Sequence, residues 1–160
     1  MQGRQEFTIR DMRASDTASV ADLIRAAFAA QSVVTNPLPS ALRETAETVA
    51  AALAAGGGAC AVADDRVIGA VLWHRQPKGL YLGRLSVASD ARGNGVALAL
   101  IGAAELACRA AGLDRLLLST RLVLADNRRL FARCGFREVG LATHPGYAAP
   151  TSVDMEKPIL

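Results

Sequence analysis

The feature that most constrains this chain of 160 residues is a glycine-bearing turn between a short apolar strand and a long alanine-rich helix. The turn contains Gly93 and Gly95, follows the apolar run 80–87 and precedes the helical run 96–111. Glycine allows positive φ and close approach to the backbone, and a helix N-terminus carries roughly half a positive charge. The turn therefore predicts a site where backbone N–H groups bind phosphate oxygens, with Arg92 as an added cation.

Two common phosphate-binding designs do not fit this turn. A P-loop requires Gly-Lys-Ser/Thr, and the sequence contains no such triplet. The dinucleotide fingerprint G-x-G-x-x-G/A fails because Leu98 occupies its third position. That design also requires an acid at the end of the following strand, whereas Asp114 precedes the strand.

The other patterns predict one α/β domain spanning residues 1–160. Alternating and apolar runs predict strands at 7–10, 59–63, 67–74, 80–87, 116–120, 136–143 and 151–157. Helical periodicity predicts helices that begin at Ser15 or Asp16, at Ser40, at Val96 and at Asp126 or Asn127, and that end near 30, 55, 111 and 135. In the second of these, Ser40 is the expected N-cap, Glu44 lies near the positive end, and Gly56–Gly58 stops the helix.

Charge and composition narrow the choice of partner. Residues 84–137 contain nine Arg and four acidic residues, a balance that suits an anionic ligand but also an ordinary solvated surface. Nucleic-acid binding is not expected, because aromatic residues make up only 4% of the chain and the basic residues are spread out. No apolar run approaches the roughly 18 residues of a membrane span, so no membrane partner is expected.

The three cysteines predict neither a disulfide framework nor a metal site. Cys60, Cys108 and Cys134 form no C-x-x-C pair, and only two histidines could join them. We expect them to be small buried hydrophobes. Residues 1–6 are polar and lack the apolar stretch of a signal peptide. A reducing cytoplasm is the expected location.

The glycine-bearing turn resembles the R/Q-x-x-G-x-G/A signature of the GNAT superfamily of acyl-CoA-dependent N-acyltransferases. Its residues here are Arg92, Gly93, Asn94, Gly95, Val96 and Ala97. Leu85 and Val87 match the end of that family's fourth strand, and residues 130–136 resemble its later L-Y-x-x-x-G-F block. The element order also matches over nearly the whole chain. The resemblance implies a mixed, mostly antiparallel sheet, splayed between its fourth and fifth strands and flanked by about four helices.

The resemblance also implies acetyl-CoA as the acyl donor and no metal. The pyrophosphate would lie on the backbone N–H groups of 92–97, and the pantetheine arm would pair with the strand backbone like an added strand. The strand residues concerned are Leu85, Ser86 and Val87. Asn127 lies where related proteins place a polar residue near the cofactor arm, although it also suits a helix N-cap.

The implied reaction is transfer of an acetyl group to an amine by direct attack on the thioester. The acceptor would be a small molecule, an amino-acid-like compound or a peptide, and family members are often homodimers. The family's usual acid is the Tyr of L-Y-x-x-x-G-F, but this chain has Phe131 there. Phenylalanine donates no proton, so a CoA-binding sensor without catalysis is the alternative function.

The proton carriers stay open at this stage. Tyr147 and His144 are candidates, because the last hairpin of this fold borders the acceptor pocket, although both also suit a plain turn. Tyr81 is another candidate or a core residue. Glu44 is a candidate to bind a cationic substrate or to act through water, or it is a solvated carboxylate. Arg84 is a candidate to attract a substrate carboxylate.

Overall fold

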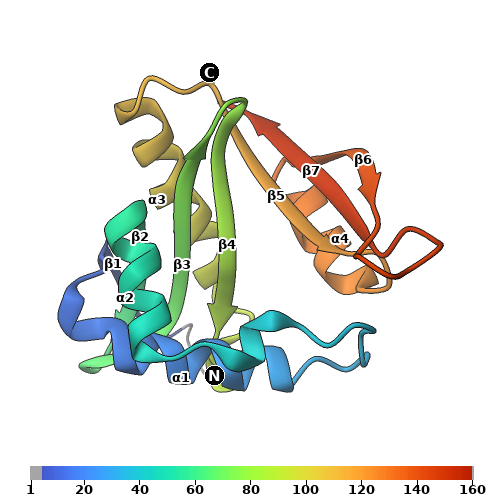
Figure 1. The fold of residues 1–160 in the computed structure, drawn as a ribbon. Coiled ribbons are helices and arrows are strands. Elements are labelled where there is room, and N and C mark those ends of the chain that lie inside the picture. Colours follow the sequence, from blue (N-terminus) through green and yellow to red (C-terminus); the bar gives the residue numbers. More distant parts are fainter. Residues whose placement is uncertain (1–4, 160) are drawn as a thin grey trace.

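A computed structural model of the chain describes residues 5–159 (Figure 1). The expectation of no signal peptide falls partly on residues 1–4, which lie outside the described residues. The strands are β1 (Thr8–Asp11), β2 (Gly57–Ala63), β3 (Arg66–Gln76), β4 (Gly79–Val87), β5 (Arg115–Arg121), β6 (Arg137–Ala142) and β7 (Ser152–Pro158). The helices are α1 (Thr17–Ala29), α2 (Ala46–Ala55), α3 (Val96–Ala110) and α4 (Ala125–Arg133), with 3-10 turns η1 (Ala14–Asp16), η2 (Ser40–Arg43) and η3 (Ser89–Ala91).

The seven strands form one sheet in the order β1-β2-β3-β4-β5-β7-β6. β4 and β5 pair in parallel, and the other neighbours pair antiparallel. The parallel pairing covers only Leu80 with Leu116 and Tyr81 with Leu117. Beyond these pairs the two strands separate, as Figure 1 shows. The expected splay between the fourth and fifth strands is therefore confirmed.

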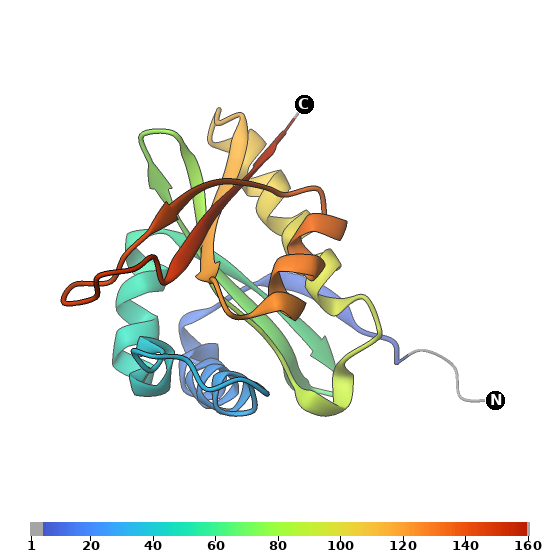
Figure 2. The ribbon, with the colours of Figure 1, turned by 90° about the vertical axis from the view of Figure 1, so that its right-hand side faces the viewer.

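Helices cover both faces of the sheet (Figure 2). Leu100 and Ile101 of α3 pack with Ile68 and Val71 in the core of one face. α1 and α2 lie on the other face, where the core is smaller; its buried residues include Val20, Ile24, Val49, Cys60 and Leu72. Residues in β2 alternate between the two cores, as a strand buried on both faces requires. No helix of residues 5–159 is long and apolar enough to cross a membrane.

The helix predicted at 40–55 is in fact two elements. η2 ends at Arg43, and Glu44 is extended with ψ 140°. α2 begins only after Thr45, whose hydroxyl accepts from the N–H of Thr48, while the Thr48 hydroxyl accepts from the N–H of Thr45. This reciprocal cap satisfies two backbone donors and sets the helix start. Ser40 is therefore not a helix N-cap, and Glu44 lies before the helix rather than in it.

Other element ends also differ from the sequence prediction. Gly57 and Gly58 belong to β2, where they pair with Trp73 and Leu72 of β3, so this strand begins two residues earlier than predicted. The N-cap of α4 is Leu124, which makes the prediction of Asp126 or Asn127 as its cap wrong. At the end of α3, Gly112 adopts φ +72° as expected for the residue after a helix.

The three cysteines are free and buried, as predicted. Burial raises the pKa of the Cys60 thiol to about 11. Burial also raises the thiol pKa of Cys108 and of Cys134. A thiol with a raised pKa is a poor nucleophile at neutral pH, because the thiolate is the reactive form.

A buried carboxylate joins β1 to the start of α1. Asp16 is 7% exposed, and Arg10 donates to both of its oxygens at 2.7 and 2.8 Å. The backbone N–H of Arg13 donates to the same carboxylate at 2.7 Å. The hydrogen bonds from Arg10 lower the pKa of Asp16 below its usual 3.8. This carboxylate therefore stabilises the fold above pH 3.8, and the stabilisation is lost as pH falls through the lower folded-state pKa.

We expect Asp16→Asn to lower the free energy of unfolding by about 1–2 kcal/mol at pH 7, since it weakens charge-assisted hydrogen bonds at a buried site. The variant should also lose less stability than the original chain on acidification to pH 3, because it lacks the titrating group. Asp22→Asn is the control, because Asp22 pairs with Arg25 while 73% exposed. Urea denaturation at pH 7 and pH 3 measures these free energies of unfolding. If Asp16→Asn and Asp22→Asn lowered the free energy of unfolding equally at pH 7, the prediction would be contradicted.

Candidate functional site

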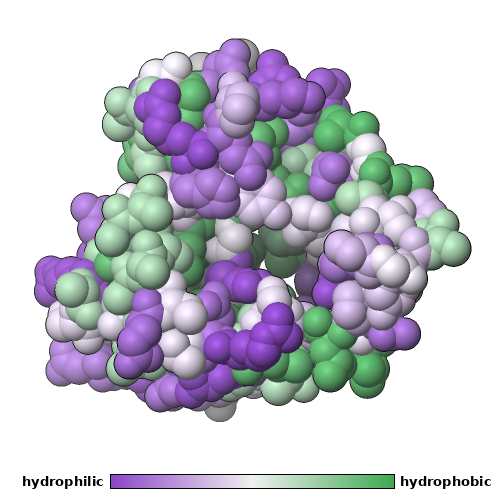
Figure 3. Space-filling model, in the orientation of Figure 1, coloured by the Kyte–Doolittle hydropathy of each residue, from purple (hydrophilic) through white to green (hydrophobic). Residues whose placement is uncertain are grey.

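The separation of β4 from β5 opens two adjoining cavities. One, of about 610 Å3, lies between the diverging strands and is called here the fork cavity; Figure 3 shows the surface hollowed at the centre of this face. The other, of about 700 Å3, lies beside the glycine-bearing turn and is called the turn cavity. The two cavities share part of their walls. Six residues line both of them, namely Phe28, Gln31, Leu85, Leu124, Asn127 and Phe131. The two cavities therefore adjoin at these residues.

The glycine-bearing turn presents backbone donors to the turn cavity. Gly93 and Gly95 adopt φ +81° and +79°, and nothing lies within 4 Å of the position where either would carry a Cβ. The first helical hydrogen bond of α3 runs from Ala99 to the carbonyl of Gly95. The N–H groups of residues 96–98 consequently have no partner within the helix, and they point from its N-terminus toward the turn cavity.

Two polar side chains of the turn have different positions. The Asn94 amide donates to the carbonyls of Ala91 and Arg92, so this side chain stabilises the turn itself. Arg92 is exposed, lines the turn cavity and forms no ion pair with another described residue. Its guanidinium is therefore available to an anionic ligand, together with the backbone donors.

The end of β4 has an irregular backbone next to the fork. Arg84 has φ +58°, which is unusual for a residue with a side chain. The pairing with β3 shifts between Ala70 and Leu72 at the same place, so β4 carries a bulge. Beyond the bulge, Leu85 and Val87 line the turn cavity, and β5 is no longer paired with β4 there. This stretch can accept an extended ligand along its open edge.

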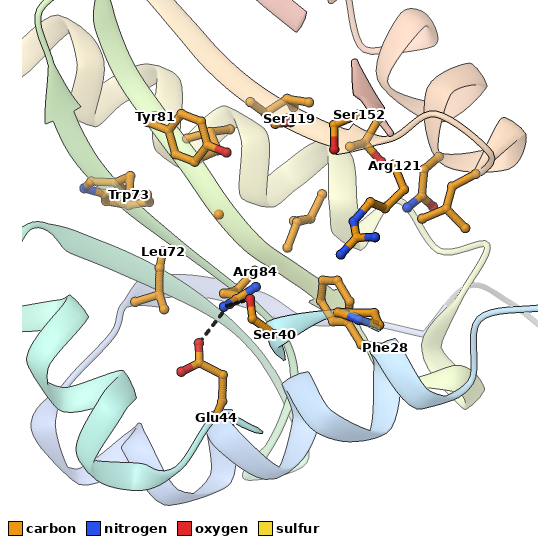
Figure 4. A pocket seen from close by; sticks show the side chains of 18 of the residues that line it. Phe28, Ser40, Glu44, Leu72, Trp73, Tyr81, Arg84, Ser119, Arg121 and Ser152 are labelled. Atoms are coloured by element: carbon orange, nitrogen blue, oxygen red, sulfur yellow. Dashed lines mark hydrogen bonds and ion pairs between the residues drawn. The ribbon is translucent and has the colours of Figure 1, made fainter. Parts of the chain in front are cut away.

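A network of polar groups holds the bulge at Arg84. Arg84 donates to the Glu44 carboxylate and to the Ser40 hydroxyl, each at 2.9 Å (Figure 4). The Thr48 hydroxyl donates to Glu44 at 2.5 Å, and Arg25 donates to the Glu44 backbone carbonyl. Glu44 is only 12% exposed. Glu44 and Arg84 therefore line the fork cavity as a neutral pair rather than as separate charges.

Tyr81 lies at the point where the fork begins. Its ring contacts that of His74, with centroids 5.2 Å apart, and its hydroxyl points toward Ser119 across the fork (Figure 4). Burial raises the pKa of Tyr81 above its usual value. The phenol is therefore protonated at neutral pH and able to donate a hydrogen bond or a proton.

The two candidate proton carriers on the hairpin between β6 and β7 have different surroundings. His144 lines the fork cavity, and its backbone N–H and ring Nδ1 both contact the Thr151 hydroxyl. The Tyr147 hydroxyl donates to the Asn36 side chain at 2.8 Å. Tyr147 is not among the described residues that line either cavity. Its position favours a role in fixing the hairpin to the loop before η2.

Phe131 and Asn127 project from α4 between the two cavities. Phe131 is 8% exposed and packs edge-to-face on Phe136, with centroids 5.9 Å apart. Its ring borders both cavities but has no polar atom. Asn127 is in the first turn of α4 and borders both cavities as well. Asn127 therefore borders both cavities and is not the N-cap of α4.

Sequence reasoning missed Arg121, which ends β5 and lines the fork cavity. The sequence did contain a hint of its position, because the alternation of a strand places Arg121 on the same face as residues 117 and 119. The sequence alone did not show that this face opens into a cavity, which depends on where β4 and β5 stop pairing. No group of three or more potential metal ligands occurs among residues 5–159.

A mixed sheet splayed beside a glycine turn and a helix N-terminus is the arrangement that the resemblance to acyl-CoA-dependent N-acyltransferases implies. The model of the acetyltransferase (GNAT) family matches residues 21–136, and the chain belongs to that family. Family membership gives it acetyl-CoA as the acyl donor, and the turn cavity fits such a ligand with its backbone donors, Arg92 and the open edge of β4. The expected family and fold class are thus confirmed.

Solved structures show the same fold at low sequence identity. A GNAT-family acetyltransferase from Staphylococcus aureus Mu50 aligns over 97% of this chain and 100% of its own, with TM-score 0.77 and 13% identity. The PaiA N-acetyltransferase from Thermoplasma acidophilum, solved with coenzyme A, aligns over 96% and 99%, with TM-score 0.79 and 16% identity. The ribosomal-protein-S18-alanine N-acetyltransferase from Escherichia coli aligns over 96% and 94%, with TM-score 0.74 and 16% identity. No match was found among curated proteins.

Proposed function

We propose that this chain is a single-domain N-acetyltransferase that moves an acetyl group from acetyl-CoA to the amine of a small molecule, an amino-acid-like compound or a peptide. The observation that carries this proposal is the continuity of the two cavities through their shared lining residues. The turn cavity suits the pyrophosphate and pantetheine arm, and the fork cavity suits the amine. In this proposal the thioester and the amine meet at the junction of the cavities, and such proximity would lower the barrier by roughly several kcal/mol.

In the proposed step, the neutral amine attacks the thioester carbonyl, a C–N bond forms and the C–S bond breaks. A backbone N–H near the β4 bulge, close to Val87, would stabilise the developing oxyanion. The amine proton must leave, and the thiolate must gain one. We propose His144 as proton acceptor, because it is an imidazole lining the fork cavity. We propose Tyr81 as proton donor, because its phenol lines the fork cavity where the two strands separate and is protonated at neutral pH.

Two of the expected catalytic residues take other roles in this proposal. Glu44 is bound to Arg84, so we propose that it positions the bulge instead of taking a proton. Tyr147 is bound to Asn36 outside the cavity lining, so we propose that it positions the last hairpin. The buried free cysteines are consistent with a cytoplasmic location, which we also propose.

The test is incubation with acetyl-CoA and a panel of amino acids, amino-acid amides, polyamines and short peptides. We expect free thiol to be released only when a suitable amine is present, with an acetylated product detected by mass spectrometry. Reactions without amine measure hydrolysis and serve as the control. Tight CoA binding without transfer to any amine would overturn the enzyme proposal. It would favour the CoA sensor that Phe131 suggests, since this position lacks the family's usual acid.

A further inference from the structure

The fork cavity contains one cation that no carboxylate of the described residues neutralises. Arg84 is paired with Glu44, and Glu44 is the single carboxylate among the residues lining this cavity. Arg121, on the opposite strand, forms no ion pair with any described residue. Among the residues that line the fork cavity, Arg121 is therefore the arginine without an acidic partner, while the nearby Asp154 carboxylate acts on Tyr81 at the closed end of the fork.

The contacts of Arg121 leave part of its guanidinium unused. Its Nη1 donates to the carbonyl of Pro37 at 2.5 Å, and its Nη2 makes a long contact of 3.5 Å with the carbonyl of Leu38. A guanidinium has five N–H donors in a fixed fork. In Figure 4 the guanidinium points into the cavity, toward Phe28 and Ser40. The other three N–H donors make no hydrogen bond with a described residue, and Arg121 lines the cavity, so they are available to a ligand there.

The surroundings of Arg121 strengthen its attraction for an anion. Burial lowers the pKa of Arg121 below its usual value, which shows that the charge has lost hydration, although arginine stays protonated. Apolar side chains make up much of the cavity wall, namely Phe28, Leu72, Trp73, Leu82 and Leu118. Poorly hydrated surroundings make an ion pair with a ligand stronger than it would be in water.

We propose that Arg121 binds a carboxylate of the acceptor, which makes the acceptor a free amino acid or a similar amine that carries a carboxylate. This proposal rests on the acetyltransferase function proposed above. The planar fork of a guanidinium matches a carboxylate with two hydrogen bonds. A peptide N-terminus fits less well, since its α-carboxyl is consumed in the peptide bond and presents no charge beside the reacting amine.

The test compares amines that differ only in this group. The panel contains amino acids with several side chains, each with its carboxamide and its decarboxylated amine, such as phenylalanine, phenylalaninamide and phenethylamine. We expect the original chain to show higher kcat/KM for the acids than for their neutral partners. Arg121→Gln should lower kcat/KM about 10- to 30-fold for the acids, through KM, and about twofold or less for the neutral partners.

Arg129→Gln is the matched control, because Arg129 is an exposed arginine of α4 that pairs with Asp126. Arg129→Gln should leave kcat/KM unchanged for both the acids and the neutral amines. If Arg121→Gln lowered kcat/KM equally for acids and neutral amines, the proposal would be overturned. That result is expected if the contact of Arg121 with Pro37 only maintains the structure, because both substrate classes would then be affected. A preference of the original chain for neutral amines would also overturn it, even if the variant failed to fold. Absence of transfer to every amine would instead refute the proposed function itself.

Discussion

Gly95→Val is expected to weaken CoA binding about 100-fold or more, because it removes backbone donors worth about 1.5–3 kcal/mol each to a charged ligand. Gly95 has φ +79° and directly precedes α3. A β-branched residue is a strong outlier in this conformation, so the backbone is expected to rotate and turn its N–H groups away from the phosphates. The valine side chain would also fill the open space over the turn. Isothermal titration with CoA measures the change.

The control for this variant is Gly112→Val at the other end of α3. Gly112 has φ +72°, and nothing lies within 4 Å of the point where a Cβ would be attached, so the backbone strain and the space are the same. Gly112→Val should lower the thermal midpoint to a similar extent, yet leave CoA affinity within about twofold, since distant sites act independently. Unchanged CoA affinity in a folded Gly95→Val protein would refute the phosphate site.

Gly79→Ala is expected to reduce the free energy of unfolding by about 3 kcal/mol, at the upper end of the range for overpacking. Gly79 begins β4 at the closed end of the fork, and an added Cβ would lie 2.4 Å from the carbonyl oxygen of Arg115. That oxygen belongs to the backbone of β5, so the clash can be relieved only by moving the strand. The corresponding fall in Tm is about 6–12 °C for a domain of this size.

Gly102→Ala provides the comparison for Gly79→Ala. Gly102 is inside α3, and nothing lies within 4 Å of its Cβ position. Alanine is favoured over glycine in a helix by about 1 kcal/mol, so this variant should be more stable than the original chain. Thermal denaturation of both variants tests the prediction. A Gly79→Ala protein as stable as the original would show that β4 and β5 can separate without cost at this end.

Much of this architecture could be predicted from local patterns. The glycine turn, the strand before it and the helix after it lie next to each other in the chain, so residues 80–111 carried their own signal. The β2–β3 hairpin was also predictable, because Asp64 and Asp65 occupy a two-residue connection and adopt φ +49° and +59°. The family resemblance supplied the splay between β4 and β5, which local periodicity does not encode.

The sequence predictions that were wrong or incomplete concern features that depend on contacts between distant segments. The predicted helix 40–55 breaks at Glu44, where Arg84 and Arg25 hold the side chain and the backbone carbonyl. Helical periodicity continues through this point, so the sequence of the segment does not show the break. Arg121 likewise looked like one more arginine of a basic region, because its setting is created by a loop more than eighty residues earlier.

The bulge at Arg84 also determines which way the rest of β4 faces. Side chains alternate along a strand, so one inserted residue inverts the facing of every later residue. If Arg84 relaxed from φ +58° to an ordinary extended conformation, Leu85 and Val87 would exchange sides with Ser86. The ion pair with Glu44 opposes that change. A loss of turnover on altering Glu44 therefore reports the alignment of the strand that holds the donor, and assigning it a proton-transfer role requires a shifted pH profile as well.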